Sequence, residues 1–93
     1  MEDYNSKLAA CREEINRIDD ELVELVIKRM ETAGKIGEIK KEAGLPVLNV
    51  KREEQVKERL LTKVPENLRE SISSLYDTLF KISRDYQEKN HEI

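Results

Sequence analysis

The sequence is poor in the residues on which many folds and sites depend. It has one cysteine, one histidine and no tryptophan, which excludes an internal disulfide and clustered-cysteine zinc sites and argues against catalytic triads. Three glycines and two prolines provide little material for a turn-rich β fold. No apolar run is long enough to span a membrane, and the acidic residues 1–4 lack the apolar segment of a signal peptide. We therefore expect a cytoplasmic protein with no metal site and no membrane contact.

Charged residues are numerous but balanced. The 17 basic and 20 acidic side chains are interspersed along the chain and give a net charge of −3 at pH 7. Interspersed charge is typical of solvated helix faces, and the basic surplus of a nucleic-acid-binding protein is absent from the sequence. Ala, Glu, Lys, Leu and Arg supply about half of the residues, a composition typical of long helices. The length favours one all-α domain over residues 1–93.

The first half of the chain has a helical repeat of apolar residues. Its seam positions recur in steps of three and four residues over five heptads, which predicts one very long helix over about residues 6–42. Asn5 or Ser6 is expected to be the N-cap, and Gly44 is expected to end the helix. The seam positions are Leu8, Cys11, Ile15, Ile18, Leu22, Leu25, Arg29, Thr32, Ile36, Ile39 and Ala43.

Two further helices are expected after a loop over residues 43–49. Asn49 is suited to cap a short, mostly charged helix over about residues 50–63. Pro65 breaks the chain, and a medium-long helix follows over about residues 66–90. That helix has an apolar stripe and a neighbouring stripe that turns polar toward its C-terminal end. The two stripes are Leu68, Ile72, Leu75, Leu79, Ile82 and Tyr86, and Tyr76, Phe80, Ser83 and Gln87.

The first helix is too long for its own chain to cover. At 1.5 Å per residue it extends about 55 Å, whereas a compact globule of this size is about 30 Å across. The rest of the chain cannot bury the whole stripe, so we expect self-association, for which a two-fold dimer is the commonest form. The predicted architecture is three helices per chain, intertwined with those of a second copy in an antiparallel helical dimer.

Two cations interrupt the long apolar stripe. Arg29 occupies a seam position, and Lys40 follows 11 residues later, about 20° from a whole number of turns. Both therefore lie on one face, about 16 Å apart along the axis, and a ligand or acidic partner fits between them. Charged seam residues can also serve only to fix register or oligomeric state. The two cations alone leave both interpretations open.

Other polar residues occupy helix positions where neither helix stability nor apolar packing requires them. Arg52 and Glu53 open the second helix, where the helix dipole favours glutamate but not arginine. The alternative is an exposed charge pair of little energetic value. Ser83 and Gln87 are four residues apart on the third helix, so they project together. Plain hydrogen bonds between helices are the alternative for these two residues.

Arg12 precedes the other candidates by a long distance on the same helix. It lies 28 residues before Lys40, about 42 Å away along a straight helix. The two residues therefore cannot share a compact pocket within one chain. In an antiparallel dimer, Arg12 of one chain can approach the region between Arg29 and Lys40 of the other. By itself, Arg12 could equally be a surface residue.

Together these residues resemble the all-helical, AroQ-class chorismate mutases of the small, single-domain, dimeric kind. The resemblance covers about residues 8–87, nearly the whole chain. Ser83 and Gln87 also stand at the family's distance from the first helices. The matching stretches are CREEINRID (11–19), VIKR (26–29), IGEIK (36–40), LPV (45–47) and KREE (51–54).

The resemblance implies an activity, a homodimer and a set of roles. Family members rearrange chorismate to prephenate, in the shikimate pathway to phenylalanine and tyrosine, in two pockets per dimer and without a cofactor. Arg12 matches the arginine lent across the dimer interface, and Arg29 matches the arginine that grips a substrate carboxylate. Lys40 matches the lysine that reaches a carboxylate and the ether oxygen. Arg52 matches the substrate-binding arginine at the start of the second helix.

The remaining matches concern the hydroxyl, the ring carboxylate and the ether oxygen of the substrate. Glu53 matches the acid that accepts a hydrogen bond from the hydroxyl. Ser83 matches a contact to the ring carboxylate, and Gln87 matches the second donor to the ether oxygen, so that Gln87 joins Arg29 and Lys40 as a catalytic residue. Asn49 stands where many members carry Asp. Because much of that contact can come from the backbone, we expect a small effect on hydroxyl recognition.

The residues present suit this chemistry. A Claisen rearrangement is unimolecular and needs no nucleophile or metal. The enzyme has to hold a dianion in its compact conformer and stabilise negative charge on the ether oxygen. Arginine forks suit carboxylates, and lysine and glutamine supply further donors. Two alternatives stay open: an isochorismate-pyruvate lyase of the same fold, and a non-catalytic helical interaction or regulatory module.

Overall fold

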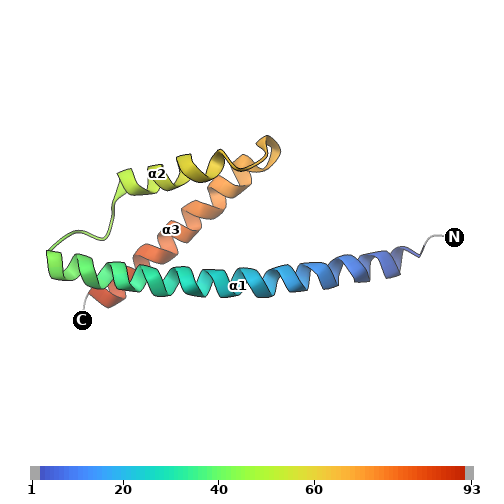
Figure 1. Ribbon diagram of the computed structural model, residues 1–93, viewed down its shortest axis with the longest axis horizontal. Helices are drawn as coiled ribbons and strands as arrows, with labels where there is room; N and C mark the ends of the chain where they lie inside the picture. Colours follow the sequence, from blue (N-terminus) through green and yellow to red (C-terminus); the bar gives the residue numbers. More distant parts are fainter. Residues whose placement is uncertain (1–2, 92–93) are drawn as a thin grey trace. The chain divides into compact units, whose positions relative to one another are not determined.

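The computed structural model describes residues 3–91, without the side chains of residues 90 and 91, and every regular element in that range is helical. In chain order the elements are α1 (Tyr4–Ala43), α2 (Val50–Leu61), a 3₁₀ helix η1 (Glu66–Leu68) and α3 (Arg69–His91) (Figure 1). The lengths of 40, 12 and 23 residues for the α-helices confirm the predicted all-α class with one very long, one short and one medium-long helix. No helix in the described range is long and apolar enough to cross a membrane.

The chain divides into two compact units. The first unit ends at Glu31, and its only regular element among the described residues is the part of α1 up to that residue. The second begins at Thr32 and contains the end of α1 with α2, η1 and α3. In the first unit the large apolar residues of the predicted stripe are 50–62% exposed, so a single chain leaves this stripe open to solvent. These residues are Leu8, Ile15, Ile18, Leu22 and Leu25.

Asp3 caps the first turn of α1. Its Oδ1 accepts hydrogen bonds from the backbone N–H groups of Asn5 at 3.1 Å and Ser6 at 3.2 Å, and its carbonyl accepts from the N–H of Lys7 at 3.1 Å. The Ser6 hydroxyl donates to Oδ2, and this bond is the main reason that the pKa of the Asp3 carboxyl is lowered. The prediction of Asn5 or Ser6 as N-cap is therefore wrong. A carboxylate suits this place because it serves two N–H donors and the positive end of the helix dipole.

α1 ends in a Schellman motif at Gly44. The N–H of Leu45 donates to the carbonyl of Lys40 at 2.8 Å, and the N–H of Gly44 donates to the carbonyl of Lys41 at 3.2 Å. Gly44 has a φ of +67°, a left-handed conformation that glycine adopts without steric cost. This confirms the predicted end of the first helix. The motif also ties the last turn of α1, which carries Lys40, to the loop that follows.

The caps of α2 and α3 differ in how well local sequence predicts them. Asn49 caps α2 as predicted, because its Oδ1 accepts from the N–H of Arg52 at 3.0 Å. α2 ends two residues earlier than predicted. The predicted helix over residues 66–90 does not start as an α-helix: the carbonyl of Pro65 accepts from the N–H of Leu68 at 2.9 Å, which closes the 3₁₀ turn of η1. The three-residue spacing of that bond makes the turn tighter than an α-helical one.

The small core of the second unit takes side chains from α1, the loop, α2 and α3. The buried apolar side chains are Ala33 from α1, Val47 from the loop, Val56 from α2 and Phe80 from α3. The ring of Tyr76 packs edge-on against the ring of Phe80, with 5.8 Å between centroids. Edge-to-face packing of this kind is favourable for aromatic pairs. The loop is therefore packed into the unit at Val47, which gives it a defined position next to the end of α1.

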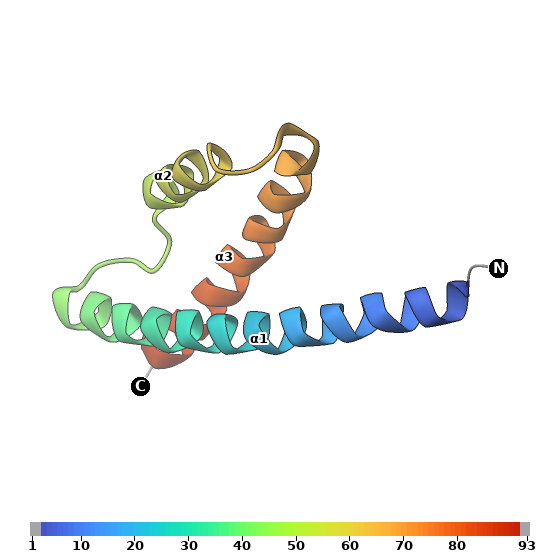
Figure 2. The same ribbon diagram turned by 45° about the vertical axis from the view of Figure 1, so that its right-hand side comes forward.

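α2 and α3 run in opposite directions on the two sides of η1 (Figures 1 and 2). Two ion pairs connect them, between Lys57 and Asp77 and between Glu53 and Arg84. As residue numbers fall along α2 they rise along α3, which is the pattern of antiparallel neighbours. The start of α2 is therefore paired with the C-terminal half of α3.

The buried face of α3 is the predicted stripe that turns polar. Phe80, Ser83 and Gln87 are all buried, so polar side chains replace apolar ones inside the second unit near the end of α3. The neighbouring apolar stripe is more open, with Leu75 47% and Ile82 43% exposed. A single chain therefore leaves apolar surface exposed on α3 as well as on the first unit.

Candidate functional site

The predicted site residues fall into both units. Arg12 and Arg29 belong to the first unit, 17 residues apart on α1 and so about 25 Å apart along its axis. Arg12 is exposed and Arg29 is half-buried. The other six belong to the second unit and can be placed relative to one another. They are Lys40, Asn49, Arg52, Glu53, Ser83 and Gln87.

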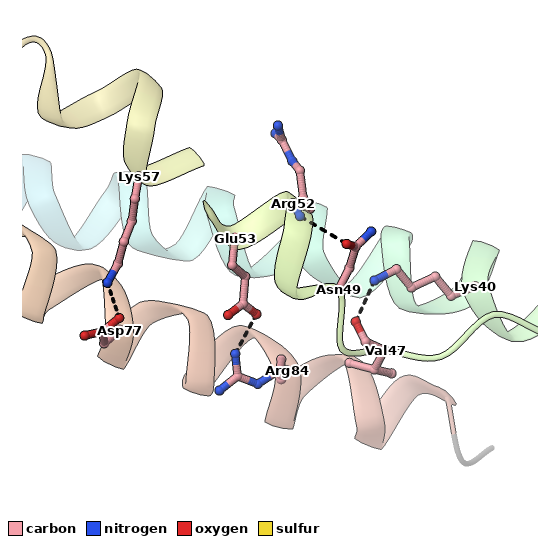
Figure 3. A network of polar contacts seen from close by, with 8 residues as sticks. All are labelled: Lys40, Val47, Asn49, Arg52, Glu53, Lys57, Asp77 and Arg84. Atoms are coloured by element: carbon pink, nitrogen blue, oxygen red, sulfur yellow. Dashed lines mark hydrogen bonds and ion pairs between the residues drawn. The ribbon is translucent and has the colours of Figure 1, made fainter. Parts of the chain in front are cut away.

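Lys40 is held at the junction of α1 and the loop. Its Nζ donates to the carbonyl of Val47 at 2.6 Å (Figure 3), and the side chain is half-buried. Val47 is itself buried, so this acceptor has a fixed position. An ammonium group has three N–H donors, and the Val47 carbonyl takes one of them. The Lys40 ammonium is therefore positioned in advance and still able to donate to a ligand.

Asn49 and Arg52 share the start of α2 but not a common direction. The Asn49 side-chain oxygen is used by the cap, since it accepts from the Arg52 N–H. The Arg52 side chain is exposed and extends away from Glu53 and α3 (Figure 3). Within residues 3–91 its guanidinium makes no hydrogen bond or ion pair. Arg52 is therefore adjacent to Glu53 in the sequence, but its guanidinium does not contact the other candidate side chains of the second unit.

Glu53 has a partner that the sequence did not predict. Its Oε2 accepts from Nη1 of Arg84 on α3 at 2.5 Å (Figure 3), with 25% of the Glu53 side chain and 32% of the Arg84 side chain exposed. The pair joins residues 31 positions apart. One sequence signal could have revealed it, because Arg84 follows Tyr76 and Phe80 at four-residue intervals and so continues their face of the helix.

Ser83 and Gln87 are buried polar side chains of α3. They are 6% and 8% exposed, respectively. The Oε1 atom of Gln87 has no hydrogen-bond partner in the described part of the chain. Buried polar atoms are normally paired, so an unpaired one marks a place where a ligand is expected. A half-turn of the amide puts Nε2 at the same point, so Gln87 can offer either an acceptor or a donor.

Gly37 allows α1 and α3 to meet closely at Gln87. A Cβ atom on Gly37 would lie 3.1 Å from Cα and O of Gln87 and 3.2 Å from its Cβ. Gly37 and Lys40 are three residues apart on α1 and share a face, so Lys40 starts from the side of the helix that meets Gln87. The sequence alone assigned no role to Gly37. The available signal was a glycine inside a long helix, which costs about 1 kcal/mol relative to alanine.

The second unit therefore combines cations with a buried amide. Lys40 and Arg84 provide two positive charges beside the single negative charge of Glu53, and Arg52 adds an exposed cation at the start of α2. This excess of positive charge suits an anionic ligand. Among the described residues, no group of three or more His, Cys, Asp or Glu side chains could hold a metal ion. The site residues offer N–H donors on Lys40, Gln87 and the arginines. Such a set can bind carboxylates and stabilise negative charge on a reacting oxygen.

Comparisons with known proteins agree on one family. The family model for chorismate mutase type II matches residues 11–88. The chain is 42% identical over 55 residues to the bifunctional chorismate mutase/prephenate dehydratase of Aquifex aeolicus, which covers 59% of this chain and 15% of that protein. It is 33% identical over 72 residues to the T-protein of Enterobacter agglomerans, covering 72% and 19%. It is also 33% identical over 54 residues to the chorismate mutase of Methanocaldococcus jannaschii, covering 58% and 54%.

These matches cover only part of each relative. The aligned segments span 15%, 19% and 54% of the lengths of the three proteins. No solved structure matches the chain. The chain therefore corresponds to one part of each longer relative, and the family model over residues 11–88 is the match that includes all the candidate residues.

Proposed function

Because the chain belongs to the type II chorismate mutase family, we propose that it converts chorismate to prephenate by an intramolecular Claisen rearrangement. The family match over residues 11–88 carries this proposal, since it includes all eight predicted site residues. The reaction would serve the biosynthesis of phenylalanine and tyrosine. It requires the enzyme to bind a dianion in a compact conformer and to stabilise the charge that develops as the C–O bond breaks.

Lys40 and Gln87 are suited to the ether oxygen. Negative charge builds on that oxygen in the transition state, and fixed donors in a water-poor site stabilise it without reorganisation. The hydrogen bond from the Lys40 ammonium to the Val47 carbonyl orients the ammonium group. Gln87 is buried, and its amide oxygen has no hydrogen-bond partner among the described residues. We assign the ether oxygen to these two side chains, with Gln87 presenting Nε2 after a half-turn of its amide.

The remaining side chains bind the periphery of the substrate. Arg12, Arg29 and Arg52 would neutralise the two carboxylates, for which the bidentate fork of arginine is well shaped. Ser83 would contact the ring carboxylate. The substrate hydroxyl would donate to Glu53, with the backbone at residue 49 as a second contact because the cap occupies the side-chain oxygen of that residue.

We further propose that two chains form an intertwined antiparallel dimer, in which 1–93 acts as one domain. The support is the apolar surface that one chain leaves open on the first unit and on α3. Apolar surface is stabilised by burial at about 25 cal/mol per Å², and a two-fold dimer covers such stripes with their own copies. In this dimer Arg12 of one chain would complete the pocket of the other. The free, exposed thiol of Cys11 suits a reducing compartment, and we propose the cytoplasm.

The direct test is the loss of chorismate absorbance on adding purified protein, with prephenate identified as the product. We expect saturable turnover from a protein that sediments as a dimer. Isochorismate should be offered in parallel, with salicylate and pyruvate as the products to be measured. Turnover of isochorismate alone would contradict the mutase activity and establish the lyase. A folded dimer that acts on neither compound and does not bind a bicyclic dicarboxylate mimic of the transition state would instead favour a non-catalytic module.

Replacing Gly37 by alanine should disturb catalysis more than stability. The new methyl group would meet the Gln87 backbone at 3.1 Å, so α3 has to shift by a few tenths of an ångström at the residue that donates to the ether oxygen. Because misplacement by about 1 Å can cost 10²-fold in rate, we expect kcat to fall about tenfold. The gain in helix propensity, about 1 kcal/mol, offsets part of the clash in the unfolding free energy.

The matched control for this variant is Glu38→Ala. Glu38 is the next residue of α1 and is exposed, so its replacement changes the same helix without touching α3. We expect wild-type kcat and melting temperature for the control. A folded Gly37→Ala variant with wild-type kcat would show that the close approach of α1 and α3 does not position Gln87.

A further inference from the structure

The ion pair between Glu53 and Arg84 uses only one of the two carboxylate oxygens of Glu53. Only one carboxylate oxygen of Glu53, Oε2, receives a hydrogen bond from Arg84. The other oxygen, Oε1, makes no hydrogen bond within the described residues. Both side chains are partly buried, so their charges are screened less than those of surface pairs. The arrangement holds the carboxylate in one orientation and leaves one oxygen available as an acceptor.

An unpaired carboxylate would be a liability in a pocket for a dianion. A negative side chain that accepts a hydrogen bond from the substrate hydroxyl also repels the two substrate carboxylates. A neighbouring guanidinium removes most of this repulsion without using the acceptor oxygen. Arg84 is placed to do so, because its guanidinium contacts the oxygen of Glu53 that the ligand would not use.

We propose that Arg84 is a positioning residue for Glu53, which orients Oε1 toward the substrate hydroxyl and cancels the charge of Glu53 toward the substrate carboxylates. This inference rests on the proposed mutase function. Arg84 itself contacts no reacting atom in this scheme. Its effect is on the binding of the dianion in both the ground state and the transition state, so it should influence KM more than kcat.

The competing explanation is that the pair only fastens α2 to α3. The chain offers a matched control, because a second ion pair, between Lys57 and Asp77, joins the same two helices (Figure 3). Lys57 is four residues beyond Glu53 on α2, and Asp77 is seven residues before Arg84 on α3. If fastening were the role of Arg84, removal of Lys57 would have a comparable effect on the reaction.

The test is a steady-state comparison of Arg84→Met, Glu53→Gln, the double variant and Lys57→Met in the full-length protein, with chorismate as substrate. We expect Arg84→Met to raise KM about tenfold, as for the loss of one partly buried charge interaction, and to change kcat less than about threefold. Arg84→Lys should recover most of the loss because it keeps the charge. In the Glu53→Gln background, Arg84→Met should raise KM by less than about threefold, since a neutral amide needs no compensation. Lys57→Met should leave KM and kcat unchanged.

Three results would overturn the inference while wild-type protein turns over chorismate. They are an unchanged KM in Arg84→Met, an equal rise in KM in both Glu53 backgrounds, and an equal rise in Lys57→Met. If Arg84→Met does not fold, as judged by circular dichroism, Arg84→Gln replaces it with the same expectations. Wild-type protein without turnover would be a different result, because it would refute the proposed function and remove the basis of the inference with it.

Discussion

Lys40→Ala is expected to lose about 10²–10³-fold in kcat while keeping its fold, the cost of removing one fixed donor to a developing oxyanion. The ether oxygen gains negative charge only as the C–O bond breaks, so the interaction with an ammonium is stronger in the transition state than with bound substrate. Loss of such an interaction lowers kcat and kcat/KM together, and loss of the carboxylate contact that the resemblance also implies for Lys40 would raise KM in addition. Stopped assays with prephenate detection would measure both parameters.

The structure also limits the cost of this replacement for stability. Lys40 makes one described hydrogen bond, from Nζ to the Val47 carbonyl, and a bond of this kind contributes about 1 kcal/mol net. The Schellman motif at Gly44 uses only backbone atoms of α1 and the loop, so it survives truncation of the side chain. The melting temperature should therefore fall by only a few degrees, as estimated from the usual entropy of unfolding.

Lys41→Ala is the matched control. Lys41 occupies the same last turn of α1, carries the same charge and is exposed. Its removal changes the net charge of the protein and of the helix end by the same amount as removal of Lys40. A general electrostatic attraction for the dianion would make the two variants similar. Wild-type turnover in Lys40→Ala, or an equal loss in Lys41→Ala, would exclude Lys40 as the donor to the ether oxygen.

Local sequence signals were sufficient for most of the fold. The three- and four-residue spacing of apolar positions predicted α1 and α3, and single residues with a clear conformational preference marked boundaries, namely Asn49 at the start of α2 and Gly44 after α1. The errors occurred where several local signals compete. Asp3 lies just ahead of Asn5 and Ser6, and its carboxylate serves the N–H groups of both. Pro65 closed a 3₁₀ turn that the helical spacing alone could not distinguish from an α-helical one.

The candidate site was less predictable because its geometry depends on contacts between distant segments. The resemblance named Glu53 and Gln87 but neither of the residues that hold them. Arg84 reaches Glu53 across 31 residues, and Gly37 meets the Gln87 backbone across 50. The local signals for both partners are weak. Arg84 is one charge on a helix rich in charges, distinguished only by its four-residue spacing from Phe80, and Gly37 is one glycine inside a helix. Only the packing of α3 against α2 and α1 identifies them.

The largest expected gain of activity comes from mixing two impaired chains. In the proposed dimer each pocket takes Arg12 from one chain and Lys40 from the other, as one straight helix holds these residues about 42 Å apart. Arg12→Ala and Lys40→Ala homodimers each lack a residue in both pockets. In a heterodimer, one pocket carries both substitutions and the other carries neither. Random exchange makes about half of the dimers heterodimers, so the mixture should reach about one quarter of wild-type turnover.

The magnitude makes this result hard to produce in another way. If Lys40→Ala alone is about 10²–10³-fold impaired, recovery to about one quarter is a rise of tens- to hundreds-fold over that parent. The activity of the Arg12→Ala homodimer is measured separately and subtracted. Exchange has to be verified with a mass-tagged chain, and mixing Lys40→Ala with Gln87→Ala is the control. Lys40 and Gln87 lie on the helices that meet at Gly37 within one chain, so one chain should supply both residues to the same pocket. Each pocket of this heterodimer then carries one of the two substitutions, and no recovery is expected. Recovery with Arg12→Ala and none with Gln87→Ala, after verified exchange, would place Arg12 across the interface. No recovery with Arg12→Ala after verified exchange would contradict a pocket shared between the two chains.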